Sequence, residues 1–170
     1  MQRLTRFFTF LFIASTICSC TISYKFNGAS IDYTKIRTIS ISDFPNNAPL
    51  VNPTLSNNLT EAIKDIYSRQ TRLEQVRRGG NLELEGEIIG YNLTPMAISA
   101  DSYSAETKLT LTVKVHFTNN VTPEDSFDKN YTAFQTFDSS RLLTDVQDEL
   151  CQTMIQEIAE SIYNDTVAKW

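Results

Sequence analysis

Between Leu109 and Thr118, apolar and polar side chains alternate without interruption. Because successive side chains of a strand point to opposite faces, the stretch from Thr107 to Thr118 predicts a β-strand with one face buried and one face in water. The residues expected on the buried face are Leu109, Leu111, Val113, Val115 and Phe117. Such a strand needs neighbouring strands and a second layer over its apolar face, and this requirement limits the folds open to the chain.

Three other segments predict the remaining strands of one sheet, the first two by the same period of two and the third by its aromatic residues Phe127, Tyr131, Phe134 and Phe137. They are Ile36 to Phe44, Leu82 to Leu93 and Phe127 to Phe137. The stretch Asn119 to Asp125 reads as a hairpin turn before the last of them.

The Leu82 to Leu93 segment has a charged outer face. Leu82, Leu84 and Ile88 lie on one side of it and Glu83, Glu85 and Glu87 on the other. Gly86 and Gly90 indicate a twist or a bulge. We expect Lys108 and Lys114 of the following strand to pair with these glutamates.

Two segments repeat apolar residues at spacings of three and four, which predicts amphipathic helices. The first extends from Leu55 to Tyr67, and the preceding Asn52 and Pro53 suit an N-cap and a first helical position. The second begins at Thr144, and Gln147 completes the pattern of a capping box. Its apolar face consists of Val146, Leu150, Cys151, Met154, Ile158 and Ile162.

The order of these elements is strand, helix, strand, strand, strand, helix. We therefore predict an α+β fold, with two helices packed on one four-stranded, mainly antiparallel sheet as a two-layer sandwich. This single domain is expected to span residues 36–170.

The first twenty residues resemble the signal and lipobox of bacterial lipoproteins. Two arginines precede an apolar run from Phe7 to Ile17, which is too short to span a bilayer. Ser19 and Cys20 then match a cleavage site and an acylated cysteine. We expect residues 1–19 to be removed, Cys20 to carry diacylglycerol and acyl groups, and residues 20–35 to form a tether. The alternative is an ordinary cleaved signal with a chance cysteine.

The net charge of the chain argues against nucleic acid as a partner. The chain carries a net charge of −5 at pH 7, and loss of the two arginines of the signal would bring it to −7. Because phosphate backbones are bound by a basic stripe, we expect no interaction with nucleic acid.

One short stretch of this acidic chain is positively charged. Arg69, Arg72, Arg77 and Arg78 fall within ten residues at the end of the first predicted helix. The helix dipole stabilises cations there, which explains part of the cluster without any function. Arginine also binds phosphate and carboxylate groups well, so an anion site is the alternative.

Residues suited to catalysis are scarce. His116 is the single histidine and falls on the polar face of a predicted strand, so we expect a surface residue. Cys151 has no partner if Cys20 is acylated, and its place on an apolar helix face predicts a buried side chain rather than a reactive thiol. No nucleotide-binding or nucleophile motif occurs. We expect neither an enzyme nor a cofactor or metal site.

Three stretches are similar to the LptE family of lipopolysaccharide-assembly lipoproteins, in its Bacteroidota branch. They are ISISDFPNNAPLVNPTLS at residues 39–56, GEIIGYNLTPMAI at 86–98 and LTLTVKVHFTN at 109–119. The resemblance implies a lipid-anchored outer-membrane protein, facing the periplasm or inside the lumen of the LptD β-barrel, with one copy per barrel. Such a protein plugs the barrel, assists its assembly and helps to insert lipopolysaccharide into the outer leaflet. The family fold, two helices on a four-stranded sheet, agrees with the order derived above.

The resemblance also directs attention to two candidate sites. Better-studied members touch the lipopolysaccharide headgroup with basic residues on sheet loops, but Thr94 to Ala105 has no lysine or arginine. We therefore take Arg77 and Arg78 as the substitute contact. For the barrel we predict the loop Phe44 to Pro53, because a proline-rich loop loses little entropy on docking. The predicted contacts are Phe44, Pro45, Asn46, Asn47, Pro49 and Asn52. The alternative is a rigid connector that only sets the first helix.

A second class of function stays open, that of a free-standing periplasmic lipoprotein that binds a lipid or a glycan. It would need an enclosed apolar cavity. The apolar positions are already accounted for by one sheet face and two helix stripes, which leaves little room for one.

Overall fold

The computed structural model describes residues 31–50, 52–96 and 105–168. The predicted signal peptide, Ser19, Cys20 and most of the tether lie outside these residues, as does most of the Thr94 to Ala105 loop. The described elements are β1 (Thr38–Ile41), α2 (Leu55–Gln70), β2 (Glu74–Val76), β3 (Leu82–Pro95), β4 (Glu106–Asn119), β5 (Phe127–Asp138) and α3 (Leu143–Thr166). A 3-10 turn, Pro123–Asp125, lies within the predicted hairpin connection.

The strands form one mixed sheet in the order β2-β1-β3-β4-β5. β3, β4 and β5 make an antiparallel meander, as predicted, whereas β1 is parallel to both β2 and β3. The α+β class and the two helices are confirmed. The predicted four-stranded, mainly antiparallel sheet is wrong in detail, because the sheet has five strands and contains a parallel part.

The extra strand is β2, which has only three residues. A segment this short and polar shows no alternation that a sequence pattern could reveal. It is parallel to β1 because α2 crosses over between the two strands. The β1-α2-β2 unit therefore adds a parallel edge to the antiparallel meander.

The predicted buried face of the sheet is confirmed. All five apolar side chains of β4 are at most 1% exposed, and Leu82, Leu84 and Ile88 of β3 are equally buried. The pairing of β3 with β4 shifts register between Ile88 and Gly90, which confirms the predicted bulge.

The two predicted lysine pairs have different outcomes. Lys114 lies opposite Glu87 in the register of β3 and β4, as expected. Lys108 lies opposite Thr94 instead, because the glutamates are confined to the first half of β3. Its ammonium group is 5.5 Å from the ring centroid of Phe134, at the distance of a cation–π contact.

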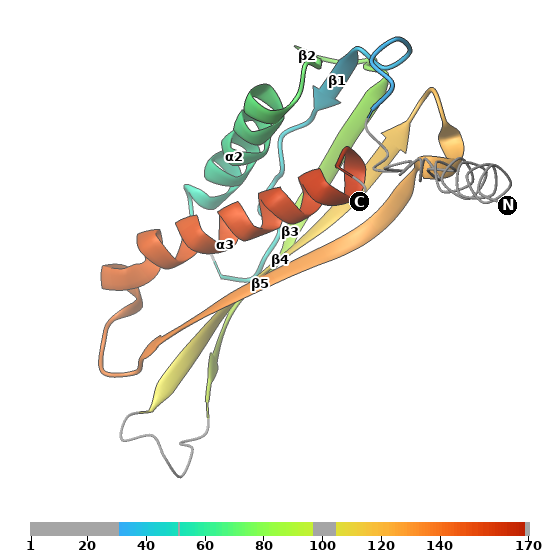
Figure 1. Ribbon diagram of the computed structural model, residues 1–170. Coiled ribbons are helices and arrows are strands. Elements are labelled where there is room, and N and C mark those ends of the chain that lie inside the picture. Colours follow the sequence, from blue (N-terminus) through green and yellow to red (C-terminus); the bar gives the residue numbers. More distant parts are fainter. Residues whose placement is uncertain (1–30, 51, 97–104, 169–170) are drawn as a thin grey trace, which may run out of the picture.

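Both helices pack on the same face of the sheet, which confirms the two-layer arrangement (Figure 1). The rings of Tyr67 on α2 and Tyr163 on α3 meet edge to face with centroids 5.6 Å apart. In the described part of the chain, neither helix combines the length and apolarity that crossing a membrane requires. The buried residues of α3 are Val146, Cys151, Met154, Ile155, Ile158, Ala159, Ile162 and Thr166.

The helix starts differ from the predictions. α2 begins at Leu55, two residues later than expected, although the Asn52 side chain still accepts the Thr54 N–H at 3.1 Å. α3 begins before Thr144, and Leu142 occupies its N-cap position without a side-chain hydrogen bond. The capping-box prediction is therefore wrong.

The far ends of β3 and β4 extend past the helices as an arm, whereas β5 ends beneath the start of α3 (Figure 1). Large apolar side chains are exposed on this arm, on β5 and on the turn between β5 and α3. They are Leu93 at 41%, Met96 at 42%, Phe134 at 57% and Leu142 at 69%. Leu93 pairs with Leu109 and Phe134 with Thr110, so these two exposed side chains lie on opposite faces of the sheet.

Candidate functional site

The loop Phe44 to Pro53 runs along the edge of β3 beyond the end of β1. The Ile88 N–H donates to the Pro45 carbonyl at 2.9 Å, and the Asn47 N–H donates to the Ile88 carbonyl at 2.9 Å. These bonds prolong the parallel pairing of β1 with β3 into the loop. Pro45 takes part through its carbonyl, so its missing N–H costs no hydrogen bond.

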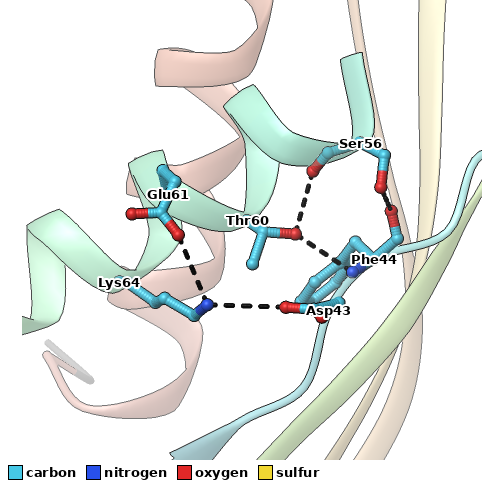
Figure 2. Close-up of polar contacts among 6 residues, drawn as sticks. All are labelled: Asp43, Phe44, Ser56, Thr60, Glu61 and Lys64. Atoms are coloured by element: carbon cyan, nitrogen blue, oxygen red, sulfur yellow. Dashed lines mark hydrogen bonds and ion pairs between the residues drawn. The ribbon is translucent and has the colours of Figure 1, made fainter. Parts of the chain in front are cut away.

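Helix α2 holds the beginning of this loop (Figure 2). The Phe44 N–H donates to Thr60 Oγ1 at 3.0 Å, and Ser56 Oγ donates to the Phe44 carbonyl at 2.6 Å. The Phe44 ring is fully buried. It occupies the space in which a Cβ atom on Gly86 would lie, so the glycine is required by this close approach.

A buried polar group holds the end of the loop. Asn52 is 3% exposed, and its Nδ2 lies 3.7 Å from Cys151 Sγ on α3. The Tyr91 hydroxyl on β3 lies 3.3 Å from the same sulfur. Burial raises the pKa of Cys151, so the thiol stays protonated at neutral pH. Its burial is confirmed, and its role in joining the loop, β3 and α3 was not visible in the sequence.

The residues predicted to touch a barrel fall into two groups, one buried in the core and one at the surface. The side chains of Phe44 and Asn52 belong to the core, so they are not available to a partner, and this part of the prediction is corrected. The sequence does not show that the absence of a side chain at Gly86 makes room for the Phe44 ring. It also does not show that Asn52 packs beside the Cys151 sulfur of α3.

The remaining residues of the loop lie at the surface. Pro45, Asn47 and Pro49 are exposed, and Asn46 is half-buried. Asn46 Oδ1 accepts the Ala48 N–H at 3.1 Å, and Asn47 Nδ2 donates to Glu87 at 2.7 Å. The loop is thus a firmly held connector with an exposed outer side, and its contact with a barrel stays a prediction.

A second candidate site is a cleft of about 530 Å³ beside β2. Its lining consists of Ile41, Ser42, Asp43, Lys64, Gln75, Val76, Arg77 and Arg78. The cleft brings the two predicted arginines together with Lys64 of α2, which sequence reasoning missed. No local pattern marks Lys64, since only the packing of α2 beside β2 places it near the arginines. Arg69, in contrast, forms an ion pair with Asp65 at 2.8 Å.

His116 lies on the open face of the sheet, as predicted. Its Nδ1 is 2.8 Å from Asp128 Oδ1, and its Nε2 is 3.2 Å from Thr118 Oγ1. Among the described residues, no group of three or more histidine, cysteine or acidic side chains is arranged to hold a metal ion.

Comparison with solved structures supports the fold. A minor lipoprotein from Acinetobacter baumannii is 14% identical, with a TM-score of 0.52, covering 78% of this chain and 94% of that chain. A hypothetical protein from Chlamydia trachomatis is 11% identical, with a TM-score of 0.50, covering 79% and 99%.

At these identities the structural matches show the fold alone. A search of curated proteins gave no match. The family model for LptE, described as lipopolysaccharide-assembly, matches residues 36–166. This match covers most of the chain, and the chain therefore belongs to the LptE family of lipopolysaccharide-assembly proteins.

Proposed function

We propose that this protein is an outer-membrane lipoprotein that associates with an LptD-type β-barrel, plugs its lumen and assists its assembly. Through this association it contributes to the insertion of lipopolysaccharide into the outer leaflet. The family match over residues 36–166 carries the proposal. The β-α-β unit and the meander under two helices are consistent with it.

Two surfaces of the domain suit contact with a barrel. The first is the outer side of the loop, where Pro45, Asn47 and Pro49 are exposed on a backbone already held by β3 and α2. A loop fixed before binding loses little conformational entropy on docking. The second is the arm, whose exposed Leu93 and Met96 would be covered in a complex.

The membrane anchor belongs to the same proposal. Acylation of Cys20 after cleavage at Ser19 would hold the domain at the outer membrane, and several acyl chains make a lasting anchor. We also propose that the chain acts without catalysis and without a cofactor. The cleft between α2 and α3 is partly open and has a lining of mixed polarity, including Asn58, Glu61 and Gln152, and so gives no support to a carrier that needs an enclosed apolar cavity.

Affinity purification tests the association. The tagged, acylated protein is recovered from outer membranes in mild detergent, and bound proteins are identified by mass. We expect a large β-barrel in near-stoichiometric amount. Recovery of the lipoprotein alone, or with only a soluble glycan or lipid, would contradict the proposal. A Cys20→Ser variant is the control for the contribution of the anchor.

A further inference from the structure

β5 is the last strand of the sheet, and one of its sides has no neighbouring strand (Figure 1). Its pairing with β4 continues over residues 127–138 without a shift in register. Just beyond this ladder, the Ser139 N–H donates to the Ala105 carbonyl at 2.9 Å. Because the direction of bonding alternates along a strand, the odd-numbered residues of β5 bond to β4 and the even-numbered residues point their backbone groups outward.

The outer side of β5 is open to a partner. Within the described part of the chain, no backbone–backbone hydrogen bond outside the β4 ladder involves residues 128–136. The side chains of the even-numbered residues are exposed as well. A strand edge with unpaired N–H and C=O groups is a template for the addition of another strand. The exposed residues of this edge are Asp128, Asn130, Thr132, Phe134 and Thr136.

The features that block pairing at most strand edges are largely missing from this one. Proline, bulges and charged side chains serve that purpose in other proteins. Residues 130–137, NYTAFQTF, contain no proline, glycine or charged residue, and their ladder with β4 has no bulge. Lys129 precedes this stretch, and its ammonium group is held by Asp165 of α3 at 2.5 Å. The uncharged part of the edge is therefore unprotected.

We propose that β5 pairs with β5 of a second copy of this chain, antiparallel about a two-fold axis at Phe134. Each Phe134 then lies opposite its own copy, and each Thr132 lies opposite Thr136 of the other copy. Outward-pointing residues meet one another in this register, so backbone hydrogen bonds form on both sides of the axis. Phe134 is 57% exposed in the single chain, and the ring of the second copy would cover it. Aromatic pairs and threonine pairs directly opposite each other stabilise paired strands.

The side chains along the edge favour this register over its neighbours. An axis one residue earlier would set Asp128 opposite Asp138 of the second copy, on both sides of the axis, and like charges directly opposite each other are destabilising. An axis two residues earlier would leave each Phe134 opposite Asn130. The edge is therefore self-complementary in one register, as a two-fold interface requires. The pairing describes copies outside a barrel and does not depend on the proposed barrel association.

Disulfide crosslinking of the full-length protein in its own membranes tests the pair. Opposed residues of a hydrogen-bonded pair have Cα atoms about 5.5 Å apart, which is within the range of a disulfide. We expect Phe134→Cys to form a covalent dimer on mild oxidation. Thr132→Cys alone should not, whereas cells that produce both Thr132→Cys and Thr136→Cys should give the dimer. The unaltered chain is the blank, because its Cys151 is buried.

A proline on the edge provides an independent test. Thr132→Pro removes an outward N–H and leaves the hydrogen bonds to β4 in place. We expect it to raise the dissociation constant of the dimer about tenfold or more, measured by sedimentation of the acylated protein in neutral detergent. The matched control is Thr132→Val, which loses the same hydroxyl contact with Thr112 at 3.2 Å but keeps the N–H. Circular dichroism shows whether each variant is folded.

Three results would overturn the proposal. They are sedimentation of the unaltered chain as a monomer at every concentration, equal crosslinking of Phe134→Cys and Thr132→Cys, and a Phe134→Cys thiol that reacts with a maleimide but forms no dimer. Adducts of Phe134→Cys with a barrel in place of its own copy would also overturn it and would assign the edge to the barrel. A β5-linked dimer that brings no barrel along in affinity purification would contradict the proposed function and leave this inference standing.

Discussion

Replacing Phe44 by alanine should destabilise the domain more than any change on the exposed side of the same loop. The Phe44 ring is fully buried over Gly86. Its backbone is held by Thr60 and Ser56 at 3.0 and 2.6 Å, so the loop does not collapse readily into the space left by the ring. A buried Phe→Ala change costs about 3–5 kcal/mol, with the larger values where a cavity persists. We therefore expect a loss of about 4 kcal/mol in the free energy of unfolding.

Urea unfolding of a form beginning at residue 21, followed by far-UV circular dichroism, measures this loss as a shift of the midpoint at constant slope. Phe134→Ala is the matched control, because Phe134 is 57% exposed. It should cost about 1 kcal/mol or less, mainly the contact with Lys108. A Gly86→Ala variant should also be destabilised, since the added methyl group meets the Phe44 ring. Equal losses for Phe44→Ala and Phe134→Ala would refute the placement of Phe44 in the core.

Further predictions concern the buried polar groups. Asn52→Ala should cost about 2 kcal/mol in the same assay through the loss of a buried hydrogen-bonding side chain, whereas Asn57→Ala on the exposed side of α2 should not destabilise the domain. The Cys151 thiol should react with iodoacetamide at pH 8 only after unfolding, and rapid labelling of the folded protein would contradict its burial. Burial raises the pKa of Cys151, Tyr67 and Tyr91 above their ordinary values of 9.0 and 10.0. The unfolded chain therefore loses these protons first. The free energy of unfolding should fall as pH rises above about 9, by up to about 1.4 kcal/mol per pH unit for each group, and the urea midpoint should fall with it. A midpoint that stays constant from pH 8 to 11 would contradict this.

Much of the fold follows from local pattern. β4 was predictable because its two faces differ completely in polarity, and α2 because Leu55, Leu59 and Ile63 recur at helical spacing. The bulge near Gly90 was visible for a similar reason, since glycine inside a strand pattern weakens regular pairing. For these elements, in which one face is buried and the other is in water, the spacing of apolar residues was sufficient to predict the element.

The parts that escaped prediction depend on contacts between distant residues. β2 is too short for a pattern, and its pairing depends on the crossover of α2. The capping box at Thr144 matched a local signature, yet the N-cap of the helix is Leu142, two residues earlier. Phe44 looked like an exposed loop residue because the space that receives it is created by Gly86 on another strand.

In the candidate site too, some features were visible in the local sequence and others depend on contacts between distant residues. Arg77 and Arg78 stood out by charge alone, but their meeting with Lys64 requires the parallel pairing of β1 and β2. The exposed loop residues could be proposed from composition, while the burial of Asn52 could not, because its neighbour Cys151 is 99 residues away in sequence.

Photocrosslinking in intact cells tests the central claim, contact with an outer-membrane barrel, most directly. A photoreactive amino acid replaces Asn47 on the exposed loop or Met96 on the arm, in the acylated full-length protein. We predict light-dependent adducts in which the partner is a large β-barrel, identified by mass. Adducts absent at both positions, or formed only with small soluble proteins, would contradict the account.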